Sequence, residues 1–265
     1  MKRLKVVSLA AAAAGVMLLT SCMKGNSSYS TADYALVESS SKLSYQKLVY
    51  PSSDYPLYIS SIANSLELQD GDCLALYYTV DNDAAENADF ASKGYKTATL
   101  AANPSTIKWS PMSFSEPDTA TVRTNEVLFT NTKIASFVSG ASQKRMFIEA
   151  ALPKMMTKQE NTYTLLCDFS QQPETVNGEN VYTIFFRGTK TRDGETPTIE
   201  GASIAHAFEA KAFYEYAKGK ATSQSGSDKK ISFRLKFPKE FNADSTKIKT
   251  WGTSDVVTFV IPAES

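Results

Sequence analysis

The chain has 265 residues, of which 42% are hydrophobic and 11% aromatic, and its 28 basic side chains balance 28 acidic ones. This composition excludes a disulfide-held miniprotein and a disordered chain, and the lack of a basic excess argues against a nucleic-acid-binding protein. The sequence holds one histidine, which almost excludes histidine-rich metal sites and histidine-pair acid–base chemistry.

Residues 1–21 have the three parts of a bacterial lipoprotein signal peptide. The first five residues carry three positive charges, and Val6–Leu19 is apolar apart from Ser8. This apolar length suits a signal peptide and is short for a membrane span. The segment ends in Leu19-Thr20-Ser21-Cys22, which resembles the lipobox of bacterial lipoproteins. The resemblance implies cleavage between Ser21 and Cys22 and attachment of acyl chains such as palmitate to Cys22. The alternatives are an ordinary signal peptide with a chance cysteine and a core helix.

Cleavage at Cys22 would change the charge balance and fix the protein to a membrane. The mature chain loses three basic residues of the original 28, so 25 basic side chains face 28 acidic ones. Because the mature chain is mildly acidic, we do not expect a polybasic patch to bind it to the membrane. The acyl chains on Cys22 are expected to bind the membrane instead. The residues Met23-Lys24-Gly25-Asn26-Ser27-Ser28 lack the acidic run of surface-exported lipoproteins, and no Asp adjoins Cys22. These features favour the periplasmic face of the outer membrane.

Residues 22–42 are serine-rich and predict a flexible tether, after which short apolar or alternating runs between turn residues predict a mostly β chain. Val, Ile, Tyr, Phe and Thr, which suit a pleated sheet, are frequent in these runs. The predicted strands are Leu43–Tyr50, Leu57–Ile62, Cys73–Val80, Tyr95–Leu100, Glu126–Thr130, Arg145–Leu152, Thr162–Phe169, Val181–Arg187, Lys230–Phe237 and Val256–Ile261.

Three local patterns sharpen this prediction. Lys230–Phe237 alternates apolar and polar residues and should bury one face. Asn177-Gly178-Glu179-Asn180 predicts a hairpin turn. Ile204–Lys220 is rich in alanine, which favours a short helix near residues 204–219, although its aromatic residues also alternate as in a strand.

The polar stretch Ala135–Lys144 predicts a domain boundary, which would separate a domain at residues 43–136 from one at residues 144–265. Two further polar segments, Gly188–Gly201 and Thr222–Asp228, predict loops.

Two segments resemble the NigD-like outer-envelope lipoproteins of Gram-negative anaerobes. The first is Leu66-Glu67-Leu68-Gln69-Asp70-Gly71-Asp72-Cys73-Leu74-Ala75-Leu76-Tyr77-Tyr78, and the second is Lys230-Ile231-Ser232-Phe233-Arg234-Leu235. The resemblance implies an OB-like five-stranded barrel over the first domain and a β-sandwich over the second. The chain departs from the family pattern near Arg187–Thr191, where Gly188-Thr189 replaces a His-Asn pair.

The remaining cysteines and the histidine offer little chemistry. Cys73 and Cys167 lie in apolar runs, which favours buried free thiols, although a disulfide is open in an oxidising compartment. A cysteine nucleophile would need His206 as its base. We expect His206 to be a solvated or hydrogen-bonded surface residue.

Acidic residues cluster around the predicted strand Cys73–Val80. Asp70, Asp72, Asp81 and Asp83 are the candidates for a paired-carboxylate glycosidase, although acidic residues at strand ends are common in turns. Asp81 and Asp83 with Glu86 are weak candidates for Ca²⁺, since the EF-hand spacing is missing. The sequence contains no nucleophile elbow, phosphate loop or HExxH motif, so no catalytic residue, resident metal or cofactor is predicted.

The aromatic residues are the candidate binding groups. Tyr45, Tyr50, Tyr55 and Tyr58 lie close together in sequence, and Trp109 and Trp251 lie in polar contexts. Exposed aromatic rings stack on sugars or anchor protein partners, whereas buried ones form ordinary core.

The sequence therefore predicts a lipid-anchored, non-enzymatic envelope module that binds a protein or a glycan. The alternatives are a hydrolase acting on cell-wall or other glycans, and a structural subunit of an envelope assembly with an open edge strand.

Overall fold

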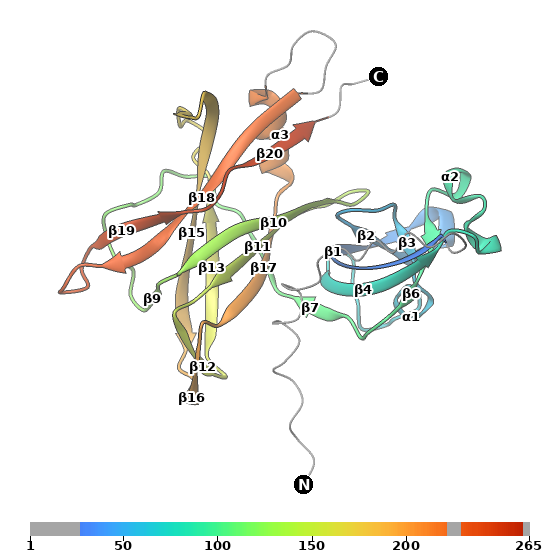
Figure 1. Ribbon diagram of the computed structural model, residues 1–265, viewed down its shortest axis with the longest axis horizontal. Coiled ribbons are helices and arrows are strands. Elements are labelled where there is room, and N and C mark those ends of the chain that lie inside the picture. Colours follow the sequence, from blue (N-terminus) through green and yellow to red (C-terminus); the bar gives the residue numbers. More distant parts are fainter. Residues whose placement is uncertain (1–26, 222–228, 262–265) are drawn as a thin grey trace. The chain divides into compact units, whose positions relative to one another are not determined.

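The protein is described here by a computed structural model that covers residues 27–221 and 229–261 (Figure 1). Most of this part of the chain is β-strand, as expected from the sequence. Contacts divide the chain into two compact units. Unit 1 comprises Met1–Trp109 and Ser136–Arg145, and unit 2 comprises Ser110–Ala135 and Met146–Ser265. None of the helices in the described part is long and apolar enough to cross a bilayer.

Unit 1 is the OB-like barrel that the resemblance implied. Its sheet follows the order β5-β3-β2-β1-β4-β6, and β7 also pairs with β4. Buried apolar side chains from β1, β2 and β4 form its core, among them Val37, Val49 and Leu76. Its elements are β1 (Ser28–Ser40), η1 (Ser41–Leu43), β2 (Gln46–Pro51), β3 (Leu57–Tyr58), α1 (Ser60–Ala63), β4 (Cys73–Asp81), η2 (Ala85–Asn87), α2 (Phe90–Lys93), β5 (Lys96–Thr97), β6 (Thr99–Leu100) and β7 (Ser105–Ile107).

Strand β1 corrects the prediction of a flexible tether over residues 22–42. From Ser28 to Ser40 the chain is a central strand, paired antiparallel with both β2 and β4. Its serines and threonines lie mostly on the more exposed first half, and Ala35, Leu36 and Val37 are fully buried. Strands β2 and β4 supply the backbone hydrogen bonds of β1, so the segment forms a strand although its side chains are largely polar. The polar composition reflects the partly solvated half of this strand.

Unit 2 is the β-sandwich that the resemblance implied. One sheet has the order β10-β11-β17-β8, and the other has the order β13-β15-β18-β19 with β9 and β14 on β15 and β20 on β18. Phe186 of β15 meets Phe208 of β17 at 6.2 Å between ring centroids, so the two sheets share an aromatic core. Its strands are β8 (Trp109–Pro111), β9 (Glu126–Val127), β10 (Asn131–Ser139), β11 (Lys144–Ala151), β12 (Lys154–Thr157), β13 (Glu160–Leu166), β14 (Glu174–Val176), β15 (Glu179–Arg192), β16 (Glu195–Glu200), β17 (Ser203–Glu209), β18 (Lys229–Phe241), β19 (Ile248–Thr253) and β20 (Val257–Ile261).

The stretch between β10 and β11, where the sequence predicts a boundary, is a hairpin end that belongs to unit 1. Glu38 of β1 is buried and accepts hydrogen bonds from the backbone N–H groups of Ser142 and Gln143. A carboxylate that accepts backbone N–H bonds in a buried position satisfies both partners, which fixes this hairpin end on unit 1.

The predicted turn and the alternating strand are both found. Asn177 and Gly178 have φ values of 50° and 84° between β14 and β15, as a two-residue hairpin loop requires. The apolar residues of β18, among them Ile231 and Phe233, are buried. Its other face is only partly exposed, because Ser232 pairs with Thr258 of β20 at 2.8 Å.

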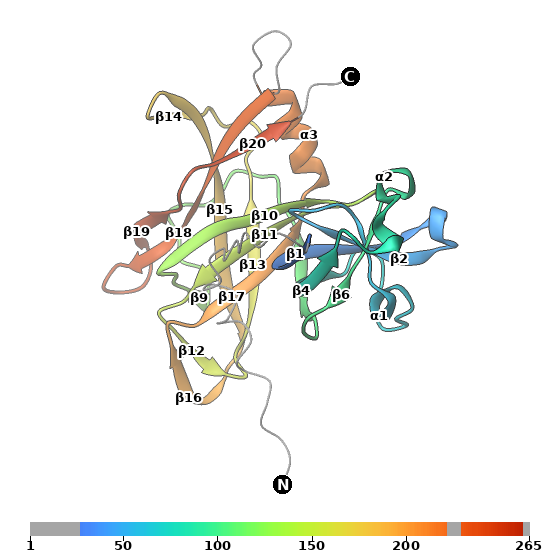
Figure 2. The ribbon, with the colours of Figure 1, turned by 45° about the vertical axis from the view of Figure 1, so that its right-hand side comes forward.

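The segment 204–220 is half strand and half helix, which corrects the prediction of one helix. Ser203–Glu209 forms β17, and α3 (Lys211–Lys220) follows after Ala210. Helix α3 packs on β18 and β20 through Phe213, whose ring lies 4.7 Å from Phe233 (Figures 1 and 2). The alternating pattern therefore predicts the structure correctly only up to the end of β17. The helix prediction is correct only for the part after Ala210.

Other predicted boundaries also need correction. Gly188–Gly201 is not a loop, because β15 runs to Arg192 and β16 pairs with β12. Leu57–Ile62 is a two-residue strand followed by α1, and Leu43–Tyr50 becomes strand only at Gln46. Thr222–Asp228 lies outside the described residues.

Candidate functional site

The four predicted tyrosines lie in unit 1 but in different settings. Tyr45 follows Ser44 in a turn where both residues have positive φ, and 75% of its surface is exposed. Tyr55 is 50% exposed and packs edge-on against Phe90 at 5.0 Å. Tyr58 is half-buried beside Tyr95.

Tyr50, by contrast, is partly buried. Burial first, and the nearby Glu38 carboxylate second, raise the pKa of Tyr50. The four rings therefore do not share one environment.

Both tryptophans contact buried arginines. Trp109 is 45% exposed, and its ring lies 4.3 Å from the Arg145 guanidinium. The indole N–H of Trp251 donates to the Thr119 carbonyl at 3.2 Å, and its ring lies 5.9 Å from the Arg187 guanidinium. Stacking on a guanidinium is a stabilising use of each ring.

The acidic residues at the two ends of β4 stabilise turns by accepting backbone hydrogen bonds. Asp70 accepts from the Ser39 N–H at 2.8 Å, Asp72 from the Gln69 N–H at 2.8 Å, and Asp81 from the Asp83 N–H at 3.0 Å. Within residues 27–221 and 229–261, no group of three or more His, Cys, Asp or Glu side chains is placed to hold a metal ion. Asp81, Asp83 and Glu86 therefore do not form the Ca²⁺ site that their spacing left open.

His206 is a core residue, which corrects the expectation of a surface position. It is 6% exposed on β17, and its Nε2 lies 2.9 Å from the Ser110 hydroxyl. Tyr163 and Phe208 pack on its ring at 5.3 and 4.9 Å.

Cys73 and Cys167 are free and buried, so the disulfide left open by the sequence is not formed. Burial raises the pKa of the Cys73 thiol to about 11 and that of the Cys167 thiol to about 12. Neither thiol is poised as a nucleophile, because the thiolate is the reactive form.

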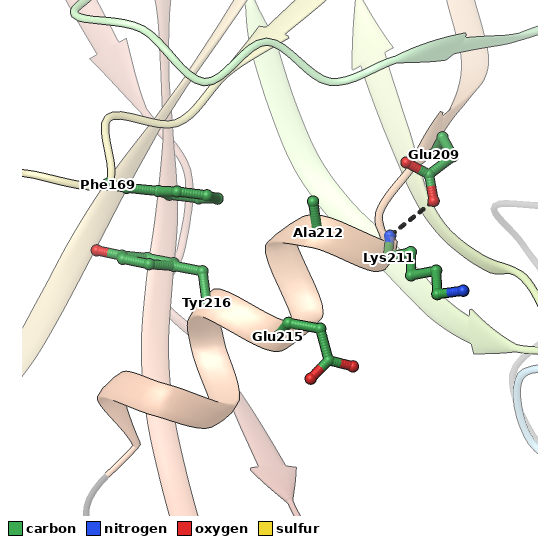
Figure 3. A pocket seen from close by; sticks show the side chains of 6 residues that line it. All are labelled: Phe169, Glu209, Lys211, Ala212, Glu215 and Tyr216. Carbon is green, nitrogen blue, oxygen red and sulfur yellow. Dashed lines mark hydrogen bonds between the residues drawn. The ribbon is translucent and has the colours of Figure 1, made fainter.

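The strongest candidate site in the described chain is an open pocket of about 770 Å³ in unit 2, which we call the α3 pocket. Figure 3 shows its side chains around the first two turns of α3. Most of the wall is apolar, and the charged groups stand at the rim. The lining residues are Phe169, Glu209, Lys211, Ala212, Glu215 and Tyr216.

An aromatic ladder forms one wall of the α3 pocket. The rings of Phe169 and Tyr216 are nearly parallel with centroids 4.1 Å apart, as Figure 3 shows. Phe114 covers Phe169 from another side at 4.4 Å, and Tyr182 meets Tyr216 edge-on at 6.1 Å. Such pairs stabilise the ladder beyond simple burial, so this wall is preformed.

Helix α3 places the other groups. Ala212 and Tyr216 are four residues apart and lie on one face of the helix. Glu209 ends β17, and its carboxylate accepts the backbone N–H of Lys211 at 2.8 Å, which satisfies the first backbone donor of the helix. Glu215 is exposed, so two carboxylates and one ammonium group surround the apolar wall.

The Tyr216 hydroxyl is buried and has no hydrogen-bond partner among the described residues. Burial is the main cause that raises the pKa of Tyr216, followed by the negative charge that Cys167 would carry if ionised.

The sequence did not predict the α3 pocket, because Phe169, Glu209 and Tyr216 come from three separate parts of the chain. The only signal was the four-residue spacing of Ala212 and Tyr216.

Comparison with known proteins identifies the first unit and the whole chain. Residues 25–104 match a family model described as a lipoprotein OB domain. Over the full chain, an uncharacterized protein from Parabacteroides merdae is 38% identical, with a TM-score of 0.80 over 88% of this chain and 100% of that one. The chain therefore belongs to the same family as the Parabacteroides merdae protein.

Two more distant solved structures match most of the chain. A candidate lipoprotein from Bacteroides fragilis is 12% identical, with a TM-score of 0.50 over 89% of this chain and 99% of that one. A NigD-like immunity protein from Bacteroides caccae is 11% identical, with a TM-score of 0.44 over 82% of this chain and 90% of that one. No curated protein matches the chain.

The expected resemblance to NigD-like lipoproteins is confirmed through the lipoprotein OB domain. The matched range begins at residue 25 and includes β1, which agrees with the strand found where a tether was expected. The match also supports a lipid-anchored protein of the cell envelope. Ser21 and Cys22, the predicted cleavage and lipidation residues, lie outside the described residues.

Proposed function

We propose that this lipoprotein is anchored by Cys22 in the outer membrane, faces the periplasm, and acts as a non-catalytic binding module. Its ligand is an envelope protein that inserts an apolar side chain into the α3 pocket. The observation that carries this proposal is the open, apolar wall of Phe169, Ala212 and Tyr216 beside the rim carboxylates. Exposed apolar surface rimmed by polar groups is typical of protein-binding sites.

The geometry favours a protein over a glycan. A sugar stacks on a free aromatic face, but Tyr216 and Phe114 cover Phe169 at 4.1 and 4.4 Å. The Lys220 ammonium also lies 5.8 Å from the Tyr216 ring. The pocket thus offers mainly ring edges and a methyl group, which suit an apolar side chain of a protein.

Both signs of charge surround the pocket. Glu209, Glu215 and Lys211 line it, and the Lys220 ammonium lies beside the Tyr216 ring. We therefore expect the partner to carry both basic and acidic residues around the inserted apolar side chain. Such rim pairs set specificity and association rate more than affinity.

Site-specific photo-crosslinking in the native envelope tests the pocket. A photoreactive residue at Glu215 should yield one dominant protein adduct, and the same residue at Lys249, an exposed position on β19, should not. Ala212→Trp fills the pocket and should abolish the adduct. Tyr214→Trp is the matched control, because it changes an aromatic side chain of the same helix that does not line the pocket.

The result is interpretable only if both tryptophan variants keep the wild-type melting temperature. An adduct that survives Ala212→Trp, or that forms equally from Lys249, would overturn the proposed pocket function.

The anchor is tested separately with Cys22→Ser, which removes the acylated thiol. The variant should leave the membrane fraction and appear in the soluble periplasm, because one or more acyl chains supply the membrane affinity. Retention in the outer membrane would contradict lipidation at Cys22.

A further inference from the structure

The length of chain between the proposed anchor and the fold limits how far unit 1 can lie from the bilayer. Strand β1 begins at Ser28, six residues after Cys22. Six residues span at most about 20 Å when fully extended. A compact unit of roughly 90 residues has a diameter of about 30 Å. The link is therefore shorter than the unit, and the start of β1 must stay close to the membrane surface.

The structure defines which surface accompanies the start of β1. Ser28 pairs with Asp81, and the side-chain amide of Asn82 donates to the Ser27 carbonyl at 2.8 Å. The loop that follows β4 is therefore fixed beside the chain entry. Tyr29, the second residue of β1, donates its hydroxyl to the Asp54 carboxylate.

A buried lysine connects Tyr29 to two exposed or half-exposed rings. The Lys96 ammonium lies 3.1 Å from the Asp54 carboxylate and 5.5 Å from the Tyr29 ring. It also lies 5.4 Å from the Tyr55 ring and 5.3 Å from the Phe90 ring. Desolvated cation–π contacts of this kind hold the rings in place, so the end surface of unit 1 is rigid.

We propose that this end of unit 1, with Tyr55 and Phe90 at its tip, rests on the lipid headgroups of the membrane that holds the anchor. The inference depends on lipidation at Cys22, as in the proposed function. Tyr55 is 50% exposed and Phe90 is partly exposed, and amphipathic aromatic rings favour the membrane–water interface.

Charge selects the kind of lipid. Asp81, Asp83, Glu86 and Asp89 are exposed on this end, and Lys93 pairs with Asp89 at 2.6 Å. The surface is therefore net acidic, and anionic headgroups would repel it. Zwitterionic phosphatidylethanolamine fits, because its ammonium group can donate hydrogen bonds to these carboxylates.

The test places a polarity-sensitive fluorophore on the lipidated protein in vesicles of zwitterionic phospholipid. Ala91→Cys, on α2 beside Phe90, supplies the site. Thr106→Cys is the matched control, because this exposed residue of β7 pairs with Leu74 at the start of β4, the end of that strand away from Asp81. Cys73 and Cys167 are buried and should not take the label. Emission from the Ala91 site should be blue-shifted and severalfold brighter than that of the same labelled protein in solution. Brominated lipids should quench this emission. The Thr106 site should show neither effect.

Equal responses at the two sites, or a stronger response at Thr106, would overturn the inference. Flotation with the vesicles reports the anchor independently. A protein that floats without a response at Ala91 refutes the docked surface and leaves the proposed function standing. A protein that fails to float refutes both.

Two perturbations test the aromatic tip and the charge argument. Tyr55→Ser removes an exposed ring and should reduce quenching at the Ala91 site without changing flotation. Added anionic lipid should also reduce quenching at low salt, and high salt should restore it because the repulsion is screened. Quenching that rises with anionic lipid, or that ignores Tyr55→Ser, contradicts the proposed contact.

Discussion

The buried ion pair of unit 2 gives the sharpest stability prediction. Arg187 on β15 is 1% exposed, and its side chain lies 2.5 Å from the carboxylate of Glu126, which is fully buried. A second contact between Arg187 Nη2 and Glu126 Oε2 measures 2.6 Å. The same guanidinium donates to the carbonyls of Asp118 and Thr121 at 2.6 and 2.7 Å, so it also holds the segment before β9.

Glu126→Gln keeps the shape of the side chain and removes its charge. Breaking a buried pair on one side leaves an uncompensated charge and destabilises a protein by about 3–5 kcal/mol. Since the two carbonyls still accept from Arg187, we expect the lower end, about 3 kcal/mol. At a typical denaturant dependence, this lowers the urea midpoint of unit 2 by about 1–2 M.

Tryptophan fluorescence can follow unit 2 separately. Trp251 lies 5.9 Å from the Arg187 guanidinium, and Trp109→Phe removes the other signal. The matched control is Glu240→Gln, which breaks the exposed pair with Lys249 at 2.6 Å and should change the midpoint little. The difference should persist in high salt, because salt screens buried pairs weakly.

A midpoint of Glu126→Gln no lower than that of Glu240→Gln would refute this reasoning. The double change Glu126→Leu with Arg187→Met should recover only part of the loss. It removes both charges but leaves the carbonyls of Asp118 and Thr121 without their donor.

Three further predictions need simpler measurements. Gly219→Ala, at an exposed and uncrowded position in α3, should stabilise unit 2 by about 0.5–1 kcal/mol in thermal unfolding, and a loss of stability would contradict its helical setting. Cys73 and Cys167 should react with an alkylating reagent at pH 8 only after unfolding, as mass spectrometry can show, since their thiol pKa values are raised to about 11 and 12. The backbone N–H groups of Thr121 and Ala120 lower the pKa of Asp118, so its stabilising effect is present above the ordinary value of 3.8 and is lost as the pH falls through the lowered value. Asp118→Asn should therefore flatten the acid limb of the stability profile, and an unchanged limb would exclude this carboxylate as a cause.

Local patterns predicted the elements whose neighbours lie close in sequence. The Asn177-Gly178 turn needed only its two positive φ values, and the apolar face of β18 needed only period-two alternation. The segment 204–220 failed because its aromatic and alanine residues satisfy a strand and a helix equally well. The structure resolves this by a switch at Ala210 between β17 and α3.

Strand β1 and the α3 pocket depend on distant partners and could not be predicted in this way. The serines and threonines of Ser28–Ser40 resemble a linker until β2 and β4 pair with them. His206 looked solvated because its hydrogen-bond partner, Ser110, lies 96 positions away. The pocket likewise needs Phe169 to meet Tyr216, which only the folded chain brings about.

The correction to β1 also changes what the lipid anchor means for function. A tether of some 20 residues would let the protein sample a wide volume, because the end-to-end distance of a flexible chain grows with the square root of its length. With β1 starting at Ser28, six residues after Cys22, the proposed anchor would hold unit 1 at the membrane. The α3 pocket lies in unit 2, whereas β1 belongs to unit 1. The proposed anchor and the proposed binding site therefore rest on different parts of the protein, so that each can be removed by substitution while the other is measured.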